Sequence, residues 1–192
     1  MDGTFRPCAK PRFGQRYVYS GYYKMHRLKF QSVVGPNGLI IELYGPLPGA
    51  RGDAHMLYKS KFHERMQTLS QIVADGNDYY VYGDAAYPLT RYTMRGYKGA
   101  MRPDERAFTV AMNTLRVSVE QAFGLVVRDW AFVDFESNLK IWKQPIAKMY
   151  VVAAILTNVK TCAMAEEHDE HGNAISARFG LNPPTIHDYL HS

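Results

Sequence analysis

The chain has 192 residues, of which 46% are hydrophobic and 21% charged, and its formal net charge is +5. This length and composition are typical of one soluble globular domain with a short appendage, and they exclude a mainly disordered chain. The two cysteines, Cys8 and Cys162, exclude a disulfide framework, so we expect free thiols in a reducing compartment. The longest apolar run, residues 150–156, is shorter than the about 20 residues that span a bilayer, and the polar start lacks a signal peptide's apolar core. We therefore expect an intracellular protein without membrane contact.

Positive charge is concentrated at the start of the chain, where aromatic residues are interleaved with it. Residues 1–30 hold seven bases against a single acid, Asp2. Such a stretch is typical of a surface that faces phosphates and bases, with a solvated pair of strands as an equally weighted alternative. Residues 165–192 hold five acids against one base, so we expect this end not to contact nucleic acid. The seven bases are Arg6, Lys10, Arg12, Arg16, Lys24, Arg27 and Lys29.

The first half of the chain predicts β structure. Residues 27–34 alternate apolar and polar, the period of a half-buried strand, and a strong turn signal at 35–38 separates them from a returning strand at 39–44. We predict a β-hairpin here, preceded by a strand fragment that begins at Asp2 and followed by a loop at 46–52.

The second half predicts mainly helices. The expected elements are a helix from 53 to about 69, a short strand at 79–82, a loop to about 103, and helices at 104–128 and 140–163. This order of elements indicates a mixed α/β fold.

The predicted helix at 104–128 has an apolar stripe and a polar one. Asn113, Arg116 and Glu120 recur at three- and four-residue steps, about 100° round the helix from the core stripe. They can deliver a carboxylate to a sheet edge. Considered alone, however, a solvated Arg116–Glu120 pair worth about 0.2–0.5 kcal/mol is the favoured alternative. The core stripe comprises Phe108, Met112, Leu115, Val119, Ala122 and Val126.

Three acids occupy positions where an acid is locally unusual. Asp2 begins a strand fragment, Asp84 ends an apolar strand, where open α/β sheets place ligands, and Glu120 lies on the helix just described. Magnesium takes hard oxygen ligands, and two such ions about 4 Å apart can drive a phosphodiester displacement. The alternatives are that Asp84 simply begins a turn and that Asp2 belongs to a frayed terminus.

Four motifs follow one another with their acids 51, 31 and 36 residues apart. They are Asp2-Gly3-Thr4, Pro48-Gly49-Ala50-Arg51-Gly52-Asp53, Gly83-Asp84-Ala85-Ala86-Tyr87-Pro88, and Asn113-x-x-Arg116-x-x-x-Glu120-x-x-x-Gly124. Together with a helical Leu156-Thr157-Asn158, they resemble the nuclease domain of PIF/Harbinger-type transposases of the DDE superfamily, over about residues 2–160.

The resemblance implies an RNase H-like fold, a mixed sheet flanked by helices, and metal-dependent cutting and joining of DNA. By position, Asp2, Asp84 and Glu120 would be the catalytic triad and would hold Mg²⁺ or Mn²⁺. Asp53 matches a fourth acid of the family that touches the metal or supports the site. A helix N-cap is an equally weighted alternative for Asp53.

The resemblance also assigns residues around the triad. Asn113 and Arg116 would position Glu120 or a phosphate. The basic residues of 6–29, with Arg95, Lys98 and Arg102, would hold the DNA backbone. The implied partners are DNA, as transposon ends and target, and a separate Myb-like DNA-binding protein. A homo-oligomer is left open, and we expect a nuclear protein.

The chain departs from the family's pattern at three places. Gly52 stands where the family often has His, Thr157 replaces another His, and the strand that normally leads into the first Asp is missing, as is any helix-turn-helix region. We therefore expect a truncated first strand that holds Asp2 loosely. Residues 1–163 would form the nuclease domain and residues 164–192 an acidic, flexible tail. The rival function is an inactive or domesticated relic that binds DNA or a partner protein.

Overall fold

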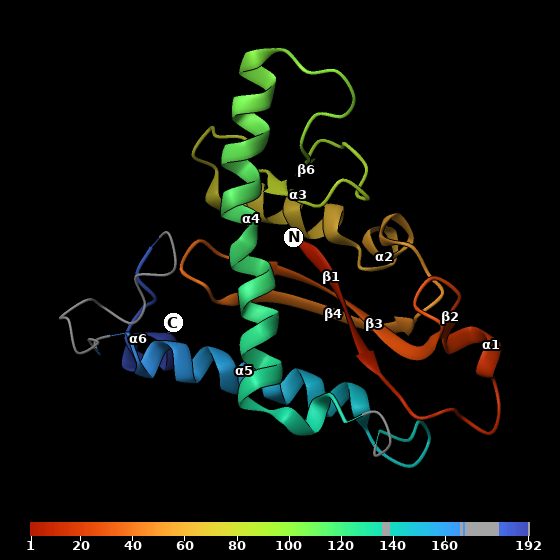
Figure 1. The fold of residues 1–192 in the computed structure, drawn as a ribbon. Coiled ribbons are helices and arrows are strands. Elements are labelled where there is room, and N and C mark those ends of the chain that lie inside the picture. Colours follow the sequence, from red (N-terminus) through yellow and green to blue (C-terminus); the bar gives the residue numbers. More distant parts are fainter. Residues whose placement is uncertain (136–138, 166, 168–180, 192) are drawn as a thin grey trace.

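The computed structural model describes residues 1–135, 139–165, 167 and 181–191 (Figure 1). Its main sheet is antiparallel and is built around β3, which pairs with β1, β2 and β4. The predicted hairpin is confirmed as β3 and β4. The four strands are β1 (Asp2–Pro7), β2 (Tyr19–Ser20), β3 (Met25–Val34) and β4 (Ile40–Pro48).

A second, smaller ladder lies beside the start of β1. Its strands β5 (Val81–Tyr82) and β6 (Thr93–Met94) run parallel to each other. The terminal ammonium of Met1 donates a hydrogen bond to the carbonyl oxygen of Tyr82 at 2.7 Å. This contact joins β1 to β5 and brings the two segments that carry Asp2 and Asp84 together.

The chain also contains helices on both faces of the main sheet (Figure 1). The longest, α4, crosses the sheet and extends well beyond it (Figure 1). The helices are α1 (Gln15–Val18), α2 (Asp53–Lys59), α3 (Phe62–Val73), α4 (Pro103–Asp129), the 3₁₀ turn η1 (Ala131–Val133), α5 (Ile146–Ala163) and α6 (Ile186–His191). The predicted mixed α/β class is thereby confirmed.

Side-chain alternation along β3 builds two cores. Phe30 packs on the face covered by α4 and α5, where its ring lies 4.6 Å from that of Tyr150. Val33 lies three residues after Phe30 on β3, so its side chain points to the other face of the sheet, where it packs with Phe62 and Met66 of α3. Full burial of one such side chain contributes about 1.5–3 kcal/mol, so both layers hold the strands that carry the acids.

Three predicted elements differ from the structure. The helix expected from 53 to 69 is divided into α2 and α3, because Lys61 adopts a left-handed conformation with φ of 54°. The loop expected at 46–52 begins later, since residues 47 and 48 still pair with β3. The helix expected from 140 begins at Ile146, after Pro145, whose ring is not tolerated inside a helix.

The long helix α4 agrees with the predicted range of 104–128 within one residue at each end. Val119, Ala122 and Val126 are buried as expected. The prediction is wrong for Leu115, whose side chain is 56% exposed. Leu115 lines an open pocket with Phe62 and Met66 of α3, so its side chain stays accessible to solvent.

The helix α5 has the length and the apolar composition of a membrane span. Its packing explains this composition, because Tyr150, Ala153 and Ala154 belong to the core beside β3. Cys162 on this helix and Cys8 after β1 are both buried, and the two form no disulfide.

Part of the segment expected to be a flexible tail is folded. The amide of Leu181 donates to the carbonyl of Pro36, and α6 packs against α5. The hydroxyl of Tyr189 contacts Asn158 at 3.2 Å. The acidic, His-containing stretch at 168–180 lies outside the described residues.

Candidate acidic site

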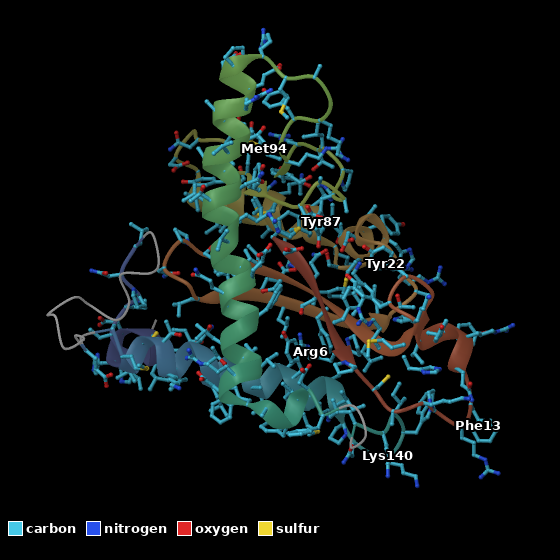
Figure 2. The ribbon with its side chains drawn as sticks, in the orientation of Figure 1. Arg6, Phe13, Tyr22, Tyr87, Met94 and Lys140 are labelled. Atoms are coloured by element: carbon cyan, nitrogen blue, oxygen red, sulfur yellow. The ribbon has the colours of Figure 1, made fainter. Side chains whose placement is uncertain are left out.

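Carboxylates from separate elements gather around the start of β1. Asp2 begins β1, Asp84 follows β5, and Asp53 is the first residue of α2. All three act on Tyr87, which is fully buried beside the start of β1 (Figure 2). Burial raises the pKa of Tyr87 most, and the charges of Asp53, Asp2 and Asp84 raise it further. Asp53 lies against Gly3, next to Asp2, and the Met1 hydrogen bond joins β1 to β5, the strand that precedes Asp84.

Asp2 is held firmly, in contrast to the loosely held residue expected from the sequence. The amide of Gly3 donates to its carboxylate at 2.7 Å, and Arg116 pairs with the other oxygen at 2.7 Å. Burial raises the pKa of Asp2, and Asp84 raises it as well, while the Gly3 amide and Arg116 act in the opposite direction.

Asp53 lies directly over the start of β1. Its oxygen is so near Gly3 that a Cβ there would come within 2.6 Å of it, and the buried Lys29 pairs with the same oxygen at 2.7 Å. The N-cap alternative is wrong, since Gly52 precedes α2 and Asp53 is its first residue. Gly3 of the Asp-Gly-Thr motif is thus explained by the close approach of a carboxylate.

Arg116 connects Glu120 to the other acids. One guanidinium nitrogen lies 2.7 Å from Asp2 and the other 3.0 Å from Glu120, so this cation bridges two predicted triad members. The i, i+4 pair with Glu120 exists as the local pattern suggests, but the tertiary contact with Asp2 gives it a second role. The Glu120 side chain is 55% exposed, so it pairs with Arg116 at the border with solvent.

Asp84 begins a turn, as its alternative interpretation predicted. Its carbonyl accepts a hydrogen bond from the Tyr87 amide at 3.0 Å. Arg95 donates to the carbonyls of Ala85 and Tyr87 at 2.9 and 3.2 Å. Arg95 therefore braces the turn that presents Asp84, in addition to any phosphate contact.

The four acids do not form a ready-made metal site in this conformation. Within the described part of the chain, no group of three or more His, Cys, Asp or Glu residues is close enough to hold one ion. Two cations account for this, because Lys29 holds Asp53, and Arg116 holds Asp2 and Glu120. A divalent ion would have to compete with these internal pairs.

Asn113 supports the site at a distance. It is exposed, and its side-chain oxygen accepts a hydrogen bond from the Tyr82 hydroxyl at 3.0 Å. This contact ties α4 to β5, so Asn113 positions the helix that carries Glu120. Tyr82, Tyr87 and Lys29 are site residues that the sequence analysis did not place there. The position of Tyr87 inside the Gly-Asp-Ala-Ala-Tyr-Pro motif was the feature of the sequence that could have indicated its place at the site.

Two of the predicted DNA-binding residues are buried. Arg6 pairs with Asp134 at 3.2 Å and lies over the Tyr150 ring, and Lys29 pairs with Asp53. Since neither reaches solvent, the structure gives both a packing role in place of the predicted phosphate contact (Figure 2).

The remaining predicted DNA-binding residues differ in their availability. Arg27 is half-buried against the rings of Phe5 and Tyr23, and Arg102 is paired with Asp104 and Glu105 at the far end of α4. The exposed bases are Lys10, Arg12, Arg16, Lys24 and Lys98. These five stay candidates for contact with phosphate.

The Leu-Thr-Asn segment of α5 has a structural role. The side chain of Asn158 accepts from the Ile40 amide and donates to the Ile40 carbonyl, both at 2.9 Å. Thr157 accepts a hydrogen bond from the Trp130 ring nitrogen at 3.0 Å. Asn158 thereby fastens the first residue of β4 to α5.

The fold and the site together define a mixed α/β domain with carboxylates from several elements around one buried tyrosine. Residues 1–158 match the DDE superfamily endonuclease family. Because the match covers most of the chain, the chain belongs to this family. No curated protein and no solved structure matches the chain.

Proposed function

We propose that this chain is the catalytic domain of a divalent-metal-dependent DNA endonuclease and transposase. The observation that carries the proposal is the arrangement at the start of β1, where Arg116 joins Asp2 to Glu120, Asp53 lies against Gly3, and the Met1 hydrogen bond joins β1 to the strand that precedes Asp84. These acids belong to motifs in the part of the chain that matches the DDE superfamily endonuclease family. DNA is the substrate class that this family implies.

The donor set fits a hard divalent cation. Carboxylate oxygens are what Mg²⁺ and Mn²⁺ prefer, and these ions keep several waters, so a few carboxylates suffice. Asp2, Asp84 and Glu120 would hold the metal, and Asp53 would assist. Bound metal would supply the activation of water and the stabilisation of the leaving oxygen. Arg116 would have to release Asp2 or Glu120 and would then be available to a phosphate.

The subtype that we propose is the PIF/Harbinger type, with an RNase H-like arrangement of the sheet. The order and spacing of the four motifs support the subtype. An antiparallel unit of β1, β3 and β4, followed by a parallel pair and flanking helices, supports the arrangement. A nuclear location, a Myb-like DNA-binding partner and transposon ends as substrate belong to the same proposal.

Calorimetric titration with Mn²⁺ tests the assembly of the site. The wild-type chain should show saturable binding at neutral pH that the Asp84→Asn/Glu120→Gln double variant loses. Circular dichroism of both proteins controls for folding. If the folded wild-type chain binds no Mn²⁺, or if the double variant binds equally well, these carboxylates are not the metal ligands.

Cleavage tests the triad itself. Asp84→Asn should lower Mn²⁺-dependent cleavage of DNA by at least about 100-fold, because charge stabilisation by the metal is worth several kcal/mol. Binding of the same DNA in EDTA should change by less than about twofold, since one surface charge contributes little to it. A variant that still cuts would overturn the assignment of Asp84.

One observation favours a second candidate function, a non-catalytic module that binds DNA or a protein. Arg116 and Lys29 already pair with three of the four acids, so the fold holds Asp2, Asp53 and Glu120 by internal ion pairs that need no metal. Tight DNA binding without Mn²⁺ binding would favour this candidate over the enzyme.

A further inference from the structure

The far end of β1 leads to an exposed aromatic surface that the acidic site does not use. Three rings there face solvent, with exposures of 72% for Phe13, 54% for Tyr17 and 86% for Trp142. Phe13 and Trp142 are 129 positions apart in sequence, yet both line one cleft of about 290 Å³. Figure 2 shows Phe13 at the edge of the molecule, with Lys140 on the adjoining segment.

The walls of this cleft are flat and rigid. Three prolines line it, Pro11, Pro46 and Pro48, and their rings restrict the backbone around the aromatic side chains. Its volume lies near the lower end of the about 300–1,000 Å³ typical of ligand pockets. A single planar ring system fits such a space, whereas a duplex or a folded segment does not.

Among the described residues, the charged side chains within the segments 10–17 and 139–143, which contribute to the cleft, are all positive. Lys10, Arg12 and Arg16 flank it on one side and Lys140 and Lys143 on the other, and all five are exposed. No Asp or Glu occurs between residues 3 and 41 or between residues 139 and 165. Among the residues that the structure describes, none pairs these five bases with a carboxylate, whereas Arg12 and Arg16 lie over the neighbouring rings of Phe13 and Tyr17.

We propose that Phe13, Tyr17 and Trp142 form a stacking site for an unpaired base of a DNA strand whose phosphates the flanking bases hold. Aromatic rings bind bases of any sequence because every base has a π face, and adjacent Lys and Arg residues attract the backbone. An apolar peptide would gain nothing from five surrounding cations. The inference rests on DNA as the ligand of the proposed function and adds single-stranded DNA as the form bound at this place.

The position of the stacking site sets its distance from the acids. β1 spans six residues from Asp2 to Pro7, which is about 17–20 Å at about 3.3 Å per residue, and the stacking site lies beyond Pro7. One strand of B-DNA advances about 3.4 Å per nucleotide, so the unpaired base would lie at least about five or six nucleotides from the reacting phosphate. A duplex with a single-stranded overhang at that distance is the fitting ligand.

Fluorescence anisotropy in EDTA tests this site without any metal chemistry. Three labelled DNAs are used: oligo(dT), a blunt duplex and a duplex with an overhang. Binding of each is measured for the wild-type chain, for the Phe13→Ala/Trp142→Ala double variant and for Trp142→Phe. We expect the double variant to bind oligo(dT) and the overhang at least about tenfold more weakly, with blunt-duplex binding changed by less than about twofold. Trp142→Phe should retain most of the affinity because a ring remains.

Tyr58→Ala is the matched control, since Tyr58 is an exposed aromatic residue on α2, away from this cleft. It should leave all three affinities unchanged. Equal weakening for blunt and single-stranded DNA, or no weakening in the folded double variant, would overturn the proposal. Because the assay contains EDTA, loss of Mn²⁺ binding in the separate titration overturns the nuclease function and leaves this result intact.

Discussion

The two ends of β1 present opposite arrangements of charge. At its start, acids from β1, α2 and α4 are paired with Lys29 and Arg116. Beyond its end, the charged residues within 10–17 and 139–143 are all bases, and aromatic rings lie among them. The first arrangement pairs acids with cations inside the fold, and the second leaves its charge for a ligand.

Burial explains why the two ends differ. The Lys29 side chain is 4% exposed, so leaving its charge without a partner there would be costly, and Asp53 supplies that partner. Lys10, Arg12 and Arg16 are hydrated and need no partner for stability. Lysine and arginine in one basic stretch of sequence therefore have different uses, which substitutions can separate.

The largest expected effect on stability is that of Lys29→Met. This substitution leaves Asp53 without its cation, and we expect the free energy of unfolding to fall by about 3 kcal/mol. That value is the lower end of the range for breaking a buried ion pair, because Asp53 keeps some contact with water. Urea unfolding measures this. Lys10→Met is the matched control, with a stability change below about 0.5 kcal/mol but weaker DNA binding. The reverse pattern would contradict the contrast between the two ends.

A smaller effect is expected for Arg116→Gln. Removing the guanidinium frees Asp2 and Glu120, so we expect Mn²⁺ affinity to rise by about tenfold, equivalent to about 1.4 kcal/mol. Calorimetry measures the affinity directly. Arg102→Gln is the control, because Arg102 pairs with acids at the other end of α4. A fall in Mn²⁺ affinity would instead show that Arg116 serves mainly to position the carboxylates.

The smallest effect is a dependence of stability on pH at Asp2. Burial above all raises the pKa of Asp2 in the folded state, so protonation favours folding. As pH falls from 7 toward about 4, the wild-type chain should gain free energy of unfolding relative to Asp2→Asn. Urea unfolding of both proteins across this range gives the sign. A relative loss at low pH would mean that the pair with Arg116 outweighs burial.

Much of the fold follows from local pattern. The hairpin around residues 35–38 and the long helix α4 were predictable, because alternation, turn residues and a three- to four-residue repeat are local properties. The break at Lys61 and the pairing of β6 with β5 were not, because no Gly or Pro marks the break and β6 is only two residues long, without an apolar run. Leu115 shows the same limit, since its exposure depends on the open pocket that it lines with residues of α3.

The site shows the same division. The sequence alone identified Asp2, Asp53, Asp84 and Glu120 as unusual acids in ordered motifs, and it identified a basic, aromatic beginning of the chain. Only the tertiary structure could decide which cation holds which acid and which rings share a cleft. Lys29 meets Asp53 across 24 positions, and Arg116 meets Asp2 across 114, because packing of the sheet and helices sets these distances. Residue types and their periodicity are encoded locally, whereas burial and long-range pairing arise only when the two cores form.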